Sequence, residues 1–112
     1  MSKIVIYERD PYVSALILDA LERCDCDVAF FSDRARLALA MKNSQVKALI
    51  AGGELARDDM TLDEIKAAHP QVQVVALTEP GDSPRKIRSA DVVLEKPLRP
   101  IDVIRSFTVC ID

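Results

Sequence analysis

The stretch IVIYERDP, residues 4–11, decides how this chain begins to fold. Four apolar residues in a row are typical of a strand that is buried on both faces of a sheet. Asp10 is a good helix N-cap and Pro11 a good first-turn residue, so a helix is predicted directly after the strand. Apolar residues then recur at helical spacing as far as Cys24, near which this helix is predicted to end.

The same alternation of strand and helix continues along the rest of the chain. Further strands are predicted at residues 27–31, 46–51, 72–77 and 92–94, further helices at about 33–41, 61–68, 84–89 and 100–111, and a looser segment at 52–60. Strands that alternate with helices form a parallel sheet, because each crossover must bury its helix against the sheet. We therefore expect one α/β domain over residues 1–112, with a doubly wound, flavodoxin-like sheet of five strands in the order 2-1-3-4-5 and helices on both faces.

Composition restricts the classes of protein to which the chain can belong. Its 112 residues are 49% apolar and 29% charged, which is the balance of a globular domain with a core. The net charge of −3 provides no general positive field for phosphate backbones, so we expect no nucleic-acid partner. The apolar run near the N-terminus is too short for a signal peptide or a bilayer span, and we expect a cytoplasmic protein that does not engage a membrane.

The residues that follow the strands are the candidates for a site, because open parallel sheets bind ligands at the carboxyl ends of their strands. These residues are Glu8, Arg9 and Asp10 after the first strand, Gly52 and Gly53 after the third, Thr78 after the fourth and Lys96 after the fifth. Two of the three glycines in the chain thus stand where the third strand would deliver a side chain to this edge.

Three of these groups of residues resemble the CheY-like receiver domains of response regulators. YERDP at 7–11 lies where that family has its acidic cluster, Thr78 where it has a hydroxyl group, and LEKPL at 94–98 where it has a lysine and a proline. The resemblance covers nearly the whole chain. It implies that an aspartate at the end of the third strand accepts a phosphoryl group, that acids after the first strand hold Mg²⁺, and that Lys96 pairs with the phosphoryl oxygens.

The sequence departs from the family pattern at the reactive positions. Gly52 stands in the place of the phosphoacceptor and has no side chain that can form an acyl phosphate. Arg9 replaces an acid expected to bind magnesium, and a guanidinium is a fixed cation with only donors, so we expect no bound Mg²⁺ and a pairing of Arg9 with its acidic neighbours. Val93 replaces the switch aromatic of the family. The resemblance is therefore to a degenerate receiver, or pseudo-receiver.

The retained polar residues also have purely structural interpretations. Lys96 can pair with Glu8 or Asp10 across the vestigial pocket, and we favour this pairing over the binding of an anionic ligand. Thr78 can satisfy backbone groups at a strand end, and Asp10 can act only as a helix cap. His69 is predicted at a helix end, where a cation suits the helix dipole. Because no pattern of catalytic side chains occurs, we expect no catalytic residue and no enzyme activity.

The three cysteines are the remaining candidates for chemistry. In a reducing compartment, an odd number of cysteines is expected to remain as free thiols or as metal ligands. The predicted topology brings the C-terminal ends of the first and last helices together, and with them Cys24, Cys26 and Cys110. These residues can be small buried apolar side chains. Alternatively, they can bind an iron–sulfur cluster or another metal, because soft metals prefer thiolates.

In its size, its lack of a phosphoacceptor and its cysteines, the chain is similar to single-domain receiver-like inhibitors of the FixT type. That resemblance implies a protein that binds and inhibits a sensor histidine kinase, with redox sensing through an iron–sulfur cluster. By analogy with receivers, we expect the partner to dock on the first helix together with the loops at the carboxyl edge of the sheet. The polar candidates there are Tyr12, Asp19, Glu22 and Arg23. Two alternatives remain open, namely an anion- or nucleotide-binding module that uses the vestigial pocket, and a structural adaptor.

Overall fold

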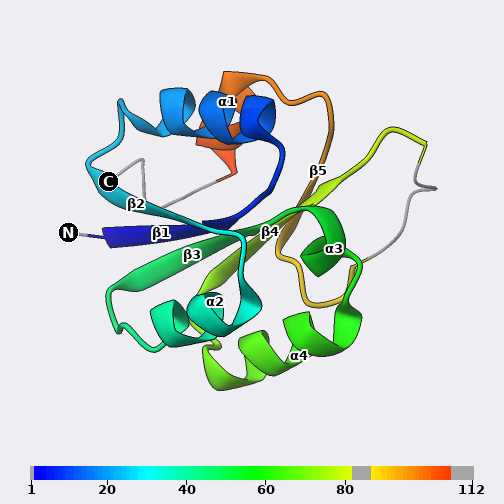
Figure 1. Cartoon of the computed structure of the whole chain (residues 1–112). Coiled ribbons are helices and arrows are strands. Elements are labelled where there is room, and N and C mark those ends of the chain that lie inside the picture. The colour runs from blue at the N-terminus through cyan, green and yellow to red at the C-terminus, as the bar shows by residue number, and fades with distance from the viewer. Residues whose placement is uncertain (1, 82–86, 107–112) are drawn as a thin grey trace.

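The computed structural model of the protein describes residues 2–81 and 87–106 (Figure 1). Its strands are β1 (Ser2–Tyr7), β2 (Cys26–Phe31), β3 (Val46–Ala51), β4 (Gln73–Thr78) and β5 (Val92–Glu95). Its helices are α1 (Pro11–Leu21), α2 (Arg34–Met41), α3 (Gly53–Ala56), α4 (Asp59–Ala68) and α5 (Pro100–Arg105).

The five strands form one parallel sheet in the order β2-β1-β3-β4-β5, which confirms the predicted fold class. In the register of the central strands, Ile6 of β1 lies opposite Phe30 of β2 and Ile50 of β3. Because all strands run in one direction, their carboxyl ends meet at one edge of the sheet. The segments that follow β1, β3, β4 and β5 are thereby brought together.

Helices cover both faces of the sheet. Figure 1 shows α1 and α5 on one face and α2, α3 and α4 on the other, and α1 and α5 are in contact, as the handedness of the crossovers predicted. Side chains that alternate along the strands fill two separate apolar clusters. The cluster beneath α1 and α5 contains Ile6, Ile17 and Val103, and the cluster on the other face contains Leu37 and Leu62.

Helix α1 begins where the sequence predicted it. The carboxylate of Asp10 accepts a hydrogen bond from the backbone N–H of Tyr12 at 2.9 Å, and Pro11 occupies the first turn. The helix ends at Leu21 rather than near Cys24. The N–H of Cys24 donates to the carbonyl of Leu21, which closes a turn at this point, so Cys24 lies in the connection to β2.

The segment after β3 is more regular than predicted. Instead of a loose loop, Gly53–Ala56 form the short helix α3, whose N-cap is Gly52 and has no side-chain hydrogen bond. Helix α4 begins at Asp59, two residues before the predicted start. The cause is Asp58, whose carboxylate accepts a hydrogen bond from the N–H of Thr61 at 3.0 Å and caps the helix.

Two predicted helices extend beyond the described residues. Of the helix predicted at 84–89, residues 84–86 lie outside them and residues 87–89 are not helical. Helix α5 ends at Arg105, and the rest of the helix predicted as far as residue 111 lies outside the described residues, except for Ser106, which forms a turn. Across 2–81 and 87–106, no helix has both the length and the apolar character needed to cross a membrane.

Candidate functional site

The candidate site is a pocket of about 150 Å³ at the carboxyl edge of the sheet, which we call the carboxyl-edge pocket. It brings together six of the seven predicted residues, Glu8, Arg9, Asp10, Gly52, Gly53 and Lys96, and it is also lined by Tyr7, Glu54 and Glu79. The seventh predicted residue, Thr78, does not line it. The Thr78 hydroxyl instead donates a long hydrogen bond of 3.5 Å to the carbonyl of Leu94, in keeping with its structural interpretation.

A buried ion pair lies at the centre of the pocket. The Lys96 ammonium donates to the Glu8 carboxylate at 2.6 Å, and the two side chains are only 9% and 2% exposed. This contact confirms the predicted pairing of Lys96 with Glu8. The alternative partner, Asp10, is instead the cap of α1. The pair joins the residue after β1 to the turn after β5, and removal of Lys96 would leave the Glu8 carboxylate buried without its cation.

Lys96 has a second acidic partner that was not predicted from the sequence. Its ammonium also donates to the carboxylate of Glu79 at 2.7 Å, and that carboxylate is 40% exposed. Burial alone lowers the pKa of Lys96, but the hydrogen bonds and charges of Glu79 and Glu8 outweigh it and raise this pKa above the ordinary lysine value. Glu79 follows Thr78 directly, so its position immediately past the fourth strand was the signal that could have found it.

Gly52 is required for space rather than for its backbone angles. Its φ of −112° and ψ of 174° are extended values that any residue can adopt. A Cβ atom at this position, however, would lie 2.0 Å from Oε2 of Glu8 and 3.2 Å from the backbone carbonyl oxygen of Tyr7. The Glu8 carboxylate therefore occupies the space in which a side chain at position 52 would begin.

Arg9 was expected to pair with its acidic neighbours in the sequence, Glu8 and Asp10. It instead pairs with Glu54 in a neighbouring network. Its guanidinium lies 2.9 Å from the carboxylate of Glu54, to which the buried Tyr7 hydroxyl also donates at 2.6 Å. The Tyr7 hydrogen bond and, after it, the charge of Arg9 lower the pKa of Glu54. Arg9 is thus directed toward α3, although it follows β1 directly in the sequence.

The charged groups of the carboxyl-edge pocket are largely paired with one another. Its four carboxylates belong to Glu8, Asp10, Glu54 and Glu79, and its two cations to Arg9 and Lys96, which leaves a formal charge of 2 − 4 = −2. The Lys96 ammonium already holds two of the carboxylates, and Arg9 holds a third. A divalent cation at Glu8 would have to displace the ammonium, and an added anion would meet excess negative charge.

The structure describes two of the three predicted metal-binding cysteines. Cys24 and Cys26 are partly buried and pack against the apolar cluster beneath α1 and α5. Cys110 lies outside the described residues. Within the described ranges, no group of three or more histidine, cysteine, aspartate or glutamate side chains is arranged to hold a metal ion. The packing of Cys24 and Cys26 suits the interpretation as small apolar residues, and the convergence of three thiols stays a prediction.

The predicted docking residues lie on an exposed surface. The outer face of α1, which we define as Tyr12, Ala15, Leu18, Asp19 and Glu22, is exposed along the whole helix, and Arg23 is exposed just beyond it. Its two large apolar side chains, Tyr12 and Leu18, are 86% and 42% exposed.

Comparison with known proteins identifies the fold. No protein-family model and no curated protein matches the sequence. A response-regulator receiver domain from Clostridium thermocellum is 23% identical, with a TM-score of 0.78 over 95% of this chain and 90% of that one. The N-terminal receiver domain of a two-component response regulator from Bacteroides fragilis is 17% identical, with a TM-score of 0.81 over 95% and 93%.

A larger protein contains the same fold as one part of its length. NtrX from Brucella abortus, solved in complex with ADP, is 20% identical with a TM-score of 0.78, and the match covers 94% of this chain but only 25% of NtrX. The chain therefore has the fold of a response-regulator receiver domain of the CheY-like type. At these levels of identity the similarity establishes the fold, and the function has to be argued from the residues of the site.

Proposed function

We propose that this protein is a pseudo-receiver of two-component signalling that binds a sensor histidine kinase and inhibits it by occupying its surface, without phosphotransfer. One observation carries the proposal. At the end of β3, where a receiver carries its phosphoacceptor aspartate, Gly52 has no side chain, and the carboxylate of Glu8 fills the space in which one would begin. The position therefore offers no carboxylate of its own to a phosphohistidine.

The surrounding charges support the same conclusion. In a receiver, the lysine after β5 is available to the phosphoryl oxygens, whereas Lys96 here is shared between two carboxylates and is almost fully buried. Lys96 is therefore held by two carboxylates of its own chain, in the place of a phosphoryl group that could bind and leave. What such a scaffold retains is its surface, and the outer face of α1 combines exposed apolar side chains, Tyr12 and Leu18, with exposed acids, Asp19 and Glu22.

A phosphotransfer assay tests this proposal. The protein is incubated with a histidine kinase that carries a radiolabelled phosphoryl group, with Mg²⁺ present and an ordinary receiver domain as the control. We expect the control to become labelled and this protein to stay unlabelled, while the kinase's rate of autophosphorylation falls as the protein is added. Stoichiometric label with the base lability of an acyl phosphate would show that the proposal is wrong.

We also propose, as a refinement, that Cys24, Cys26 and Cys110 form one redox-sensitive site whose occupancy tunes binding to the kinase. Its basis is the contact between α1 and α5, the two helices after which Cys24 and Cys110 follow in the sequence, and the preference of iron for thiolates. Protein purified without oxygen is then expected to absorb visible light and to bleach in air. Serine variants of each cysteine should lose this absorption, and an unchanged, colourless protein would refute the cluster.

A binding screen separates this proposal from the ligand-binding alternative. Thermal unfolding is followed with added phosphate, nucleotides and cyclic dinucleotides, and we expect no increase in melting temperature because both cations of the carboxyl-edge pocket are already paired. A stabilisation that disappears in Lys96→Met would favour an anion- or nucleotide-binding module. Capture of a large complex without a kinase would favour a structural adaptor.

A further inference from the structure

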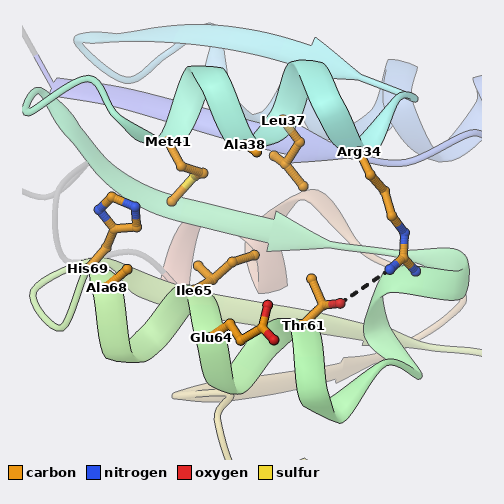
Figure 2. Close-up of a pocket in the computed structure, with 9 residues that line it drawn as sticks. All are labelled: Arg34, Leu37, Ala38, Met41, Thr61, Glu64, Ile65, Ala68 and His69. Carbon is orange, nitrogen blue, oxygen red and sulfur yellow. Dashed lines mark hydrogen bonds between the residues drawn. The ribbon is translucent and has the colours of Figure 1, made fainter.

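A second hollow lies on the face of the sheet opposite α1 and α5. It is a groove between α2 and α4 with a volume of about 200 Å³. Figure 2 shows that the labelled side chains of the two helices point toward one another across this space, with Arg34 and Thr61 at one end and His69 at the other. We call it the α2–α4 groove. None of its lining residues lines the carboxyl-edge pocket.

The interior of the groove is apolar and preformed. Leu37 and Met41 of α2 are each 2% exposed and belong to the apolar cluster on this face of the sheet. Ile65 of α4 is partly buried and packs against that cluster. Ala38 and Ala68 lie nearer the surface and are exposed. Leu37 and Met41 thus form a buried floor, and Ala38, Ile65 and Ala68 provide the apolar surface that an apolar ligand would remove from water.

The charges that line the groove favour a cation. Arg34 is compensated by Asp58 at 2.5 Å, and it also donates to the Thr61 hydroxyl at 3.3 Å. Glu64 is exposed at the rim, and within the described part of the chain it has no ion-pair partner. The lining therefore presents one uncompensated negative charge beside an apolar surface.

We propose that the α2–α4 groove binds a small amphipathic amine, with its alkyl or aromatic chain against Ala38, Ile65 and Ala68, above the floor of Leu37 and Met41, and its ammonium group at Glu64. A volume of about 200 Å³ suits a ligand of roughly seven non-hydrogen atoms, because a water molecule takes up about 30 Å³ in the liquid. A carboxylate of the same size would be repelled by Glu64 and would find the Arg34 guanidinium already held by Asp58. The site is independent of the proposed kinase-docking face, so either proposal can fail without the other.

Three ligands of nearly equal size test the proposal: hexylamine, hexanol and hexanoate. Each is titrated into the isotope-labelled protein at pH 8, where histidine side chains carry little charge, and the methyl signals of Leu37, Ala38, Met41 and Ile65 are followed by NMR. We expect saturable shifts with hexylamine at a dissociation constant of about 1 mM or tighter. Binding of hexanol is expected to be about two- to fivefold weaker, because an ion pair at an exposed carboxylate contributes little, and binding of hexanoate is expected to be weaker still because the two carboxylates repel each other. Absent saturation, or equal binding of the amine and the carboxylate, would overturn the proposal.

Two variants with one matched control locate the site. Ala38→Trp should fill the groove and abolish the hexylamine shifts, whereas Ala35→Trp, on an exposed position of α2 that does not line the groove, should leave them unchanged. Glu64→Gln should reduce hexylamine affinity by about two- to fivefold and leave hexanol affinity as it was. Retention of amine binding in a folded Ala38→Trp variant would show that the groove is not the site. Retention of the amine preference in Glu64→Gln would show that Glu64 does not hold the ammonium group and would overturn the proposal in that form.

Discussion

The carboxyl-edge pocket and the outer face of α1 use their side chains in opposite ways. In the pocket, charged groups turn inward and pair, so that Lys96 and Glu8 are only 9% and 2% exposed. On α1, apolar groups turn outward, and Tyr12 is 86% exposed. Burying a charge is costly unless it is paired, and exposed apolar side chains are typical of surfaces that bind partners.

This difference suggests that the carboxyl-edge pocket serves stability and that the outer face of α1 serves recognition of a partner. If the carboxyl-edge pocket is now a structural element, substitutions there should lower the free energy of unfolding and affect a partner only through folding. If the outer face of α1 is the docking surface, substitutions there should change affinity and leave stability as it was. The following four predictions test this separation, from the largest expected effect to the smallest.

Lys96→Met is expected to have the largest effect on stability. It leaves the Glu8 carboxylate buried without its cation, which costs about 3–5 kcal/mol when one member of a buried pair is removed. Urea unfolding followed by circular dichroism measures the change. Lys66→Met is the matched control, because Lys66 pairs with Asp91 in a more exposed position and should cost at most about 1 kcal/mol. Equal losses in the two variants would contradict the structural role of the pocket.

Gly52→Ala is expected to cost about 2–3 kcal/mol, in the upper part of the range for overpacked sites. The new methyl group would coincide with the Glu8 carboxylate, which the bond to Lys96 prevents from moving freely. The double variant Gly52→Ala/Glu8→Ala removes the obstacle, so the two substitutions should be strongly coupled in a double-mutant cycle of unfolding free energies. Simple additivity would mean that the carboxylate does not fill this space.

Tyr12→Ala and Leu18→Ala should show the reverse behaviour. Both side chains are exposed, so unfolding free energies are expected to change by no more than about 0.5 kcal/mol. Affinity for the histidine kinase, measured by calorimetry or surface plasmon resonance, should fall by about tenfold or more if these side chains are anchors of the interface. A loss of stability with unchanged affinity would show that the outer face of α1 supports the fold and is not the docking surface.

The smallest effect concerns pH and the N-terminus of α4. The hydrogen bond from Arg34 and, after it, those from Thr61 lower the pKa of Asp58 to about 2. Because the folded-state pKa lies below the unfolded one, this group stabilises the fold fully above about pH 4, and the contribution is lost as pH falls toward 2. Unfolding measured from pH 5 to pH 2 should therefore depend less on pH in Asp58→Asn than in the natural protein. Identical pH profiles would show that the contact contributes nothing.

Much of the fold could be predicted because its signals are local. The run before Glu8, the cap at Asp10 and Pro11 together define the first strand and helix, and the structure has both. Helix α3 was missed because it lacks such a local signal. It is only four residues long, Gly53–Ala56, and its glycine N-cap provides no side-chain hydrogen bond. Boundaries such as the start of α4 depended on which of several acids acts as the cap, and Asp58 does so.

The site was predictable at its positions and in the pairing of Lys96 with Glu8, but not in its other pairs. Parallel strands bring the residues after them to one edge, so Glu8, Gly52 and Lys96 were predicted to meet there. The choice of Glu79 as the second partner of Lys96, and of Glu54 as the partner of Arg9, depends on how each side chain is directed in space. Strand order defines neighbouring positions, but it does not specify rotamers.

The ion pair of Glu8 and Lys96 joins residues that are 88 positions apart, and this separation has a consequence for synthesis. A growing chain leaves the ribosome with its N-terminus first, so β1 and Glu8 emerge long before Lys96. Until that lysine appears, burying Glu8 would place a carboxylate in the interior without its principal counter-ion. Ribosome-bound chains that end before residue 96 should therefore fail to reach the final packing around β1, and native-like protease resistance should appear only when Lys96 has left the exit tunnel.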